Sequence, residues 1–128
     1  MKKKYRVLVV EDMLFMRDMI VSFIRKIFPD IEVDVANNGA DAQKKMEIAP
    51  PDLILCDWEM PDIKGNELLR WMRNHHSSAI SAMPFIMVTA KREREAILEA
   101  KELGVTDYVI KPLTIDLLSS KIKAVLKL

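Results

Sequence analysis

Five side chains that could take part in phosphoryl or metal chemistry each follow a short, largely apolar run in this sequence. Glu11 and Asp12 follow residues 6–10, Asp57 follows 53–56, Thr89 follows 85–88 and Lys111 follows 108–110. Such runs are typical of strands buried on both faces of a parallel sheet. Because parallel strands end at a common edge, where open α/β sheets bind ligands, we expect these five side chains to meet there.

Three of the five are acids, so the expected site needs positive charge. Two carboxylates about 4 Å apart repel by about 4 kcal/mol at an effective dielectric constant of 20. Mg²⁺ binds through one or two carboxylates together with phosphate oxygens and waters, which suits Glu11, Asp12 and Asp57. Lys111 would supply a second positive charge. The alternative is that the three acids are unrelated solvated groups at strand ends.

A carboxylate in such a site can act as a nucleophile and form an acyl phosphate. A metal ion and Lys111 would neutralise the charge on the phosphoryl group during transfer. The Thr89 hydroxyl could donate to a phosphoryl oxygen. Alternatively, Thr89 is a strand-end threonine that bonds only to backbone.

The elements that must position these residues alternate between strand and helix. Helical patterns cover residues 14–28, 39–48, 65–74, 92–103 and 115–126, with a polar loop at 75–83 and Gly104 as a C-terminal cap. The run 31–35 alternates apolar and acidic residues, which favours a sheet edge. The sequence therefore predicts an α/β fold, a doubly wound five-stranded parallel sheet of order 2-1-3-4-5, flavodoxin-like, with (βα)5 connectivity.

Composition narrows the functional class. The chain has 128 residues, of which 50% are hydrophobic and 30% are charged, and this predicts one globular domain. A net charge of +1 gives no indication of nucleic-acid binding. The first apolar run is too short for a signal peptide or a membrane span, so we expect a cytoplasmic protein without membrane insertion. The single Cys56 is expected to be a buried thiol.

Four motifs in order resemble the receiver domains of bacterial two-component response regulators. They are residues 9–12, residues 57–61 with Gly65, residues 88–90 and residues 108–112. The resemblance covers the whole chain without a large gap. Phe15-Met16-Arg17, Trp58 and residues 87–90 are most similar to the single-domain chemotaxis regulators of that family.

The resemblance implies a role for each motif residue. Asp57 would be the phosphoacceptor, Asp12 a direct Mg²⁺ ligand, Glu11 a ligand acting largely through water, and the Glu59 carbonyl would complete the metal shell. Thr89 would be the switch hydroxyl, Tyr108 the switch aromatic and Lys111 the phosphoryl contact, followed by a cis Lys111–Pro112 bond. The chain departs from the chemotaxis pattern at Glu11 and Glu59, where Asp and Asn are usual, and at Lys64, where an acid is common.

The resemblance also implies the function. Residues 1–128 would form a single receiver domain without an output domain, monomeric, phosphorylated by a sensor histidine kinase with Mg²⁺. It would not be an enzyme beyond its own phosphorylation and dephosphorylation. Phosphorylation would change a partner face that includes Ile97, Lys101, Tyr108 and Lys121. The expected partner is a downstream target in chemotaxis, such as the flagellar motor switch.

Three other functions remain open at this stage. The chain could be a stand-alone phosphorelay intermediate or a phosphate sink. A haloacid-dehalogenase-like phosphatase also uses a nucleophilic Asp, but that family has a second Asp where this chain has Glu59, and it needs a cap that this chain has no room for. A flavodoxin-like cofactor binder needs a Ser/Thr/Gly-rich phosphate loop, which residues 13–16 lack.

Glu59 and Lys91 are predicted to set the lifetime of the acyl phosphate. Glu59 lies two residues after Asp57, and Lys91 lies two residues after Thr89. The two predicted strands that they follow are neighbours in the expected sheet order. Their opposite charges would let them bridge and obstruct the in-line approach of water to phosphorus. The alternative is two mobile, solvated side chains.

Overall fold

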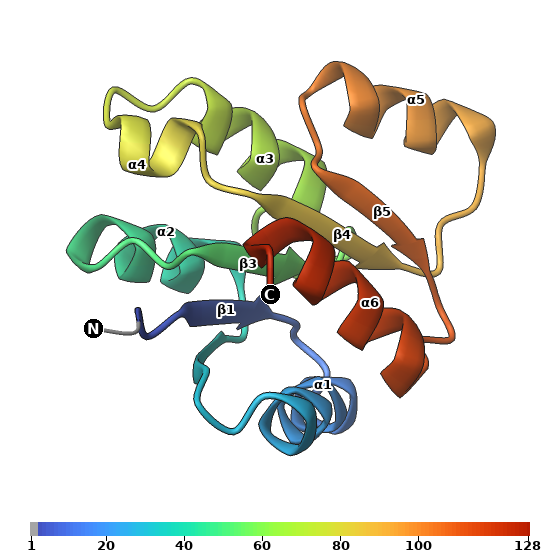
Figure 1. The fold of residues 1–128 in the computed structure, drawn as a ribbon. Coiled ribbons are helices and arrows are strands. Elements are labelled where there is room, and N and C mark those ends of the chain that lie inside the picture. The colour runs from blue at the N-terminus through green and yellow to red at the C-terminus, as the bar shows by residue number, and fades with distance from the viewer. Residues whose placement is uncertain (1–2) are drawn as a thin grey trace.

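A parallel sheet of five strands forms the centre of the molecule in this computed structural model, which describes residues 3–128 (Figure 1). The strands are β1 (Arg6–Val10), β2 (Glu32–Ala36), β3 (Leu53–Cys56), β4 (Phe85–Thr89) and β5 (Asp107–Ile110). Their order is β2-β1-β3-β4-β5, and every neighbouring pair is parallel. The predicted sheet order, with β2 at an edge, is confirmed.

Helices cover both faces of the sheet. They are α1 (Leu14–Ile27), α2 (Gly39–Ile48), α3 (Gly65–Arg73), α4 (Ser78–Ser81), α5 (Arg94–Glu102) and α6 (Ile115–Leu126). The prediction that residues 75–83 form only a loop is wrong, because α4 lies within them. Ile80 and Met83 are buried there and attach this otherwise polar segment to the core. The predicted helix 92–103 begins two residues later, at Arg94.

Alternate strand residues divide the interior into two cores, one on each side of the sheet. Val7, Val9 and Leu55 pack with α1 and α6 on one side. Leu8, Val10 and the neighbouring strand residues of that orientation pack with α2, α3, α4 and α5 on the other (Figure 1). Burial on both faces explains the continuous apolar runs of β1, β3 and β4.

Local signals end the elements much as the sequence indicates. Gly104 follows α5 with φ of +88°, the left-handed conformation that favours glycine.

Two further expectations from the sequence are met: Cys56 is a buried free thiol, and the Lys111–Pro112 peptide is cis. Within residues 3–128, none of the helices has the length and apolar character needed to cross a bilayer.

Candidate functional site

Asp57 lies immediately after β3, and its two carboxylate oxygens have different partners. Oδ1 accepts hydrogen bonds from the backbone amides of Trp58 (2.6 Å) and Glu59 (3.4 Å). Oδ2 accepts from Lys111 Nζ at 3.0 Å. The Asp57 amide donates to the Val10 carbonyl, which extends the pairing of β1 and β3 to this residue. The carboxylate is therefore oriented by the loop on one side and by an ammonium group on the other.

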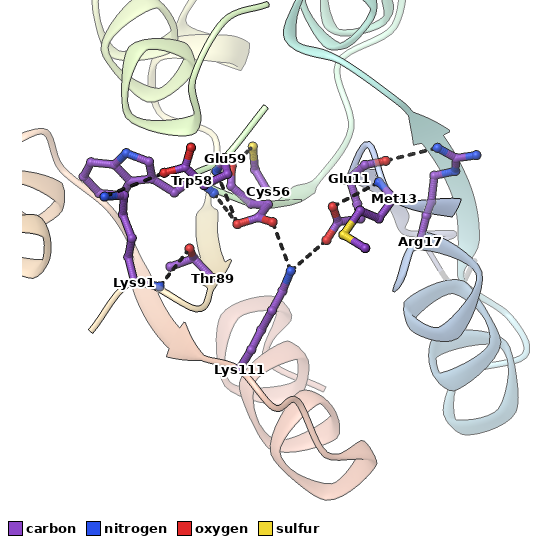
Figure 2. Close-up of polar contacts among 10 residues, drawn as sticks. Glu11, Met13, Arg17, Cys56, Trp58, Glu59, Thr89, Lys91 and Lys111 are labelled. Atoms are coloured by element: carbon purple, nitrogen blue, oxygen red, sulfur yellow. Dashed lines mark hydrogen bonds and ion pairs between the residues drawn. The ribbon is translucent and has the colours of Figure 1, made fainter. Parts of the chain in front are cut away.

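Lys111 joins two acids that are far apart in the sequence. Its Nζ donates to Glu11 Oε1 at 2.9 Å as well as to Asp57 (Figure 2). Burial lowers the pKa of Lys111, but the hydrogen bonds from its ammonium to Glu11 and Asp57 outweigh that effect and raise it. Lys111 is therefore positively charged at neutral pH, as the sequence-based charge argument requires.

Glu11 is almost fully buried, with 1% of its surface exposed. Its Oε2 accepts from the Met13 amide at 3.3 Å, and its backbone carbonyl accepts from Arg17 Nη1 at 3.1 Å (Figure 2). Burial raises the pKa of the Glu11 carboxyl, and the lowering by Lys111 does not cancel this. Glu11 and Lys111 thus meet after their strands, as the sequence indicated, and are in direct contact.

Asp12 is exposed, unlike Glu11. Among residues 3–128, no group of three or more His, Cys, Asp or Glu side chains is already arranged to hold a metal ion. Mg²⁺ does not require such a cage, because it binds through one or two carboxylates and keeps several waters. Asp12, Asp57 and the Glu59 carbonyl are hard oxygen donors of the required type, and three acids with one lysine leave negative charge for a cation to balance. The donor set therefore suits Mg²⁺.

Thr89 and Tyr108 both contact the backbone of Lys91, in the loop between β4 and α5. Thr89 Oγ1 accepts from the Lys91 amide at 3.2 Å, the backbone-bonded alternative for this residue (Figure 2). Tyr108 Oη donates to the Lys91 carbonyl at 2.8 Å. Partial burial raises the pKa of Tyr108, so its hydroxyl remains a donor at neutral pH. Two hydroxyl groups thus hold one loop residue.

Lys91 also lies next to the predicted lifetime residue Glu59. Its Nζ is 3.7 Å from Glu59 Oε1 and 5.6 Å from the centre of the Trp58 ring. A shorter contact of 3.0 Å joins Lys64 Nζ to Glu59 Oε2, and this hydrogen bond lowers the pKa of Glu59. The structure therefore brings Glu59 and Lys91 together but shares Glu59 with Lys64, which the sequence argument left out.

The predicted partner face lies around the edge strand β5. Tyr108 is on β5, Ile97 and Lys101 are on α5, and Lys121 is on α6. Lys101 is exposed, whereas Ile97 and Lys121 are half-buried. Lys121 Nζ forms a 2.8 Å ion pair with Asp107 Oδ2 on β5. Lys121 is therefore already engaged in joining α6 to the sheet edge.

Two further positions were not anticipated. Asp62 accepts backbone hydrogen bonds at the start of α2, although an exposed loop acid gives no sequence signal for this. The His75 side chain is 8% exposed and contacts Glu47 Oε2 at 3.0 Å, a partner 28 residues away that the local sequence does not reveal.

A groove of about 450 Å³ lies at the opposite end of the sheet, before the strands begin. Tyr5, Phe28 and Leu128 line it, together with Lys3, Asp30 and other residues outside the acid cluster. This groove does not include any of the candidate site residues at the strand ends.

Comparison with known proteins identifies the family of this chain. The family model for the response regulator receiver domain matches residues 7–123. The chemotaxis protein CheY of Pseudomonas aeruginosa is 32% identical over 120 residues, 94% of each chain. A protein-glutamate methylesterase/protein-glutamine glutaminase of Bacillus subtilis is 37% identical over 109 residues, which are 84% of this chain but 29% of that protein.

Solved structures show the same architecture. The chemotaxis response regulator CheY4 of Vibrio cholerae superposes with a TM-score of 0.86 at 28% identity, covering 96% of this chain and 99% of that one. A response regulator from Chloroflexus aurantiacus gives a TM-score of 0.88, also at 28% identity, and covers 98% and 100%. The family model and the similar sequences and structures agree with one another, and the chain belongs to the response regulator receiver domain family.

Proposed function

We propose that this protein accepts a phosphoryl group on Asp57 from a phosphorylated histidine of a sensor kinase and signals through a changed protein-binding face. One observation carries the proposal: Asp57 sits at the end of β3 with Oδ1 held by backbone amides and Oδ2 by Lys111. An oxygen of this carboxylate attacks phosphorus, the phosphorus–nitrogen bond breaks, and the released imidazole nitrogen takes a proton from water. The product is an aspartyl phosphate.

Receiver domains generally bind Mg²⁺, and we assign its ligands here to Asp12, Asp57 and the Glu59 carbonyl, with Glu11 acting through water. When bound, the ion supplies positive charge to the phosphoryl oxygens. Lys111 provides the protein's own positive charge next to the Asp57 oxygen. Trp58 and Glu59 orient the carboxylate through their amides, and Asp57 as a whole is only 9% exposed.

We further propose that the loop after β4 transmits the signal. Thr89 would exchange its bond with the Lys91 amide for a phosphoryl oxygen, and this would shift Lys91 and the Tyr108 hydroxyl bonded to it. Tyr108 would then turn further inward and alter the face formed with Ile97, Lys101 and Lys121. A shift from 1:99 to 99:1 requires about 5.5 kcal/mol of differential stabilisation. A phosphoryl charge of about −2 beside Lys111 can supply much of it.

The similarity to chemotaxis proteins of Pseudomonas aeruginosa and Vibrio cholerae favours a chemotaxis output, with the flagellar motor switch as target. A monomeric state and a cytoplasmic location stay part of this proposal. A phosphorelay intermediate or phosphate sink is the second candidate, because the site chemistry would be the same. A phosphatase acting on other substrates is disfavoured, because the Glu59 carboxylate contacts Lys64 and Lys91.

The test is phosphorylation by labelled acetyl phosphate. Label should enter the parent protein only with Mg²⁺, should be absent from Asp57→Asn, and should be retained in Asp18→Asn, which changes an exposed acid on α1. Equal labelling of parent and Asp57→Asn would contradict the assignment. Turnover of p-nitrophenyl phosphate would instead indicate a phosphatase. Capture of a motor-switch protein by the phosphorylated form, but not by Asp57→Asn, separates the chemotaxis output from a relay.

A further inference from the structure

Asp62 connects the loop after Asp57 to a helix that lies outside the site. Its Oδ1 accepts from the Gly39 amide and its Oδ2 from the Ala40 amide, both at 2.8 Å. These partners are 23 and 22 residues away and form the first turn of α2. Because the acceptor is a carboxylate, each bond is stronger than a bond between neutral groups. The Asp62 bridge is therefore a specific contact between two segments and not a general solvation of the acid.

Gly39 allows this contact by lacking a side chain. A Cβ at Gly39 would lie 2.6 Å from the Cβ of Ile63. The loop that carries Asp62 and Ile63 is consequently seated directly against the start of α2. At its other end, the Gly65 amide donates to the Trp58 carbonyl at 2.8 Å. The segment from Trp58 to Gly65 is thus fastened to itself at one point and to α2 at another.

The same segment sets the direction of the phosphoacceptor. Its Trp58 and Glu59 amides donate to Asp57 Oδ1, which leaves Oδ2 to Lys111. Any displacement of the segment moves these two amides relative to the carboxylate. We propose that Asp62 is a positioning residue for phosphoryl transfer, because its bridge to α2 holds the loop that aims Asp57. This inference rests on the proposed function of Asp57.

A simpler role for Asp62 would be to stabilise α2 alone. The chain offers a matched control for that role, because Asn38 is the local N-cap of the same helix and accepts from the Asp41 amide at 2.7 Å. Asn38 caps α2 without contacting the site loop in any hydrogen bond found among the described residues. Removing Asn38 weakens the helix start, whereas removing Asp62 weakens the helix start and also releases the loop.

The experiment compares Asp62→Ala, Asp62→Asn and Asn38→Ala with the parent. Hydrogen exchange of the Trp58 and Glu59 amides is measured without Mg²⁺. The rate of Asp57 phosphorylation is measured at saturating Mg²⁺ and acetyl phosphate. We expect Asp62→Ala to speed exchange of these amides and to slow phosphorylation, each by about fivefold, from the usual range for a lost cap. Asp62→Asn should give a smaller change, and Asn38→Ala should lower the urea midpoint with both rates within about twofold of the parent.

Equal effects of Asp62→Ala and Asn38→Ala on the two rates would overturn the proposal, as would parental rates in Asp62→Ala. If Asp62→Ala does not fold, the same two rates measured in Asp62→Asn are compared with those of Asn38→Ala and the parent. A parent protein that takes up no label would refute the proposed function instead. The exchange measurement in metal-free protein would still decide whether Asp62 holds the loop.

Discussion

Two loops flank Asp57, and they are held in opposite ways. The loop after β3, residues 57–64, is fixed at two points. The carboxylate of Asp62 in this loop accepts hydrogen bonds from the first amides of α2, and the Gly65 backbone packs closely against the backbone of Asp57 and Trp58. The loop after β4, residues 90–93, is held at Lys91 by the hydroxyls of Thr89 and Tyr108. Neutral hydrogen bonds of this kind contribute about 1 kcal/mol each and can be exchanged for others. The molecule thus combines a fixed loop that orients the Asp57 carboxylate with a loop whose hydrogen bonds can be exchanged, as the proposed switch requires.

The fixed loop should be the more sensitive of the two to a single added methyl group. A Cβ at Gly65 would lie 2.2 Å from the Asp57 carbonyl oxygen and 2.9 Å from the Trp58 Cα, both backbone atoms. Gly65→Ala should therefore lower the free energy of unfolding by about 3 kcal/mol or more, measured by urea denaturation.

Gly104→Ala provides a control away from the site. Gly104 has φ of +88°, so alanine there is strained but does not meet the Asp57 backbone. It should cost about 1–2 kcal/mol and leave phosphorylation of Asp57 at the parental rate. If Gly65→Ala were no more destabilising than Gly104→Ala, the loop after β3 would not be rigidly fixed at Gly65.

The releasable loop should loosen without affecting the fixed one. Tyr108→Phe removes the donor to the Lys91 carbonyl, and we expect a loss of about 1 kcal/mol in the free energy of unfolding. Amide exchange at residues 91–93 should accelerate, while exchange at Trp58 and Glu59 stays parental. Acceleration at Trp58 as well would show that the two loops move together.

The pair of Glu59 and Lys91 is a direct contact between the two loops. Because Glu59 is exposed, its loss should change stability by only about 0–1 kcal/mol. Glu59→Ala and Lys91→Ala should each speed the loss of phosphate from Asp57, and the double variant should add little. Lys64→Ala is the control, since it leaves the Lys91 contact in place. Parental lifetimes in both single variants would remove the pair as a determinant.

The smallest expected effect is a dependence on pH. Slight burial raises the pKa of Asp62, but the amides of Ala40 and Gly39 outweigh this and hold it below its ordinary value of 3.8. A carboxyl whose pKa is lower when folded stabilises the protein above its unfolded pKa and loses that contribution as pH falls. The stability difference between parent and Asp62→Asn should be constant above about pH 5 and shrink below 3.8. Urea titrations from pH 6 to pH 3 test this, and a difference that grows on acidification would contradict it.

The sequence predicted the fixed elements of this site better than its contacts. Apolar runs and the alternation at residues 31–35 predicted the sheet order, because the spacing of apolar residues along a strand reflects whether one or both of its faces are buried. The strand ends placed Asp57, Thr89 and Lys111 together for the same reason. Asp62 and Lys64 were missed, because an exposed loop acid and an exposed lysine look alike in sequence whether solvated or paired. Their partners are fixed by how loops pack, and local patterns do not report that.

Lys111 has a consequence for how the protein is made. It contacts Glu11 across 100 positions of the chain and Asp57 across 54. Synthesis proceeds from the N-terminus at about 5–20 residues per second, so Glu11 and Asp57 leave the ribosome seconds before Lys111. During that interval the two acids lack the Lys111 ammonium group, and β4 lacks its neighbouring strand β5. A nascent chain thus carries Asp57 well before Lys111 is present to balance its charge, and the arrangement of charges around Asp57 is complete only when β5 joins the sheet.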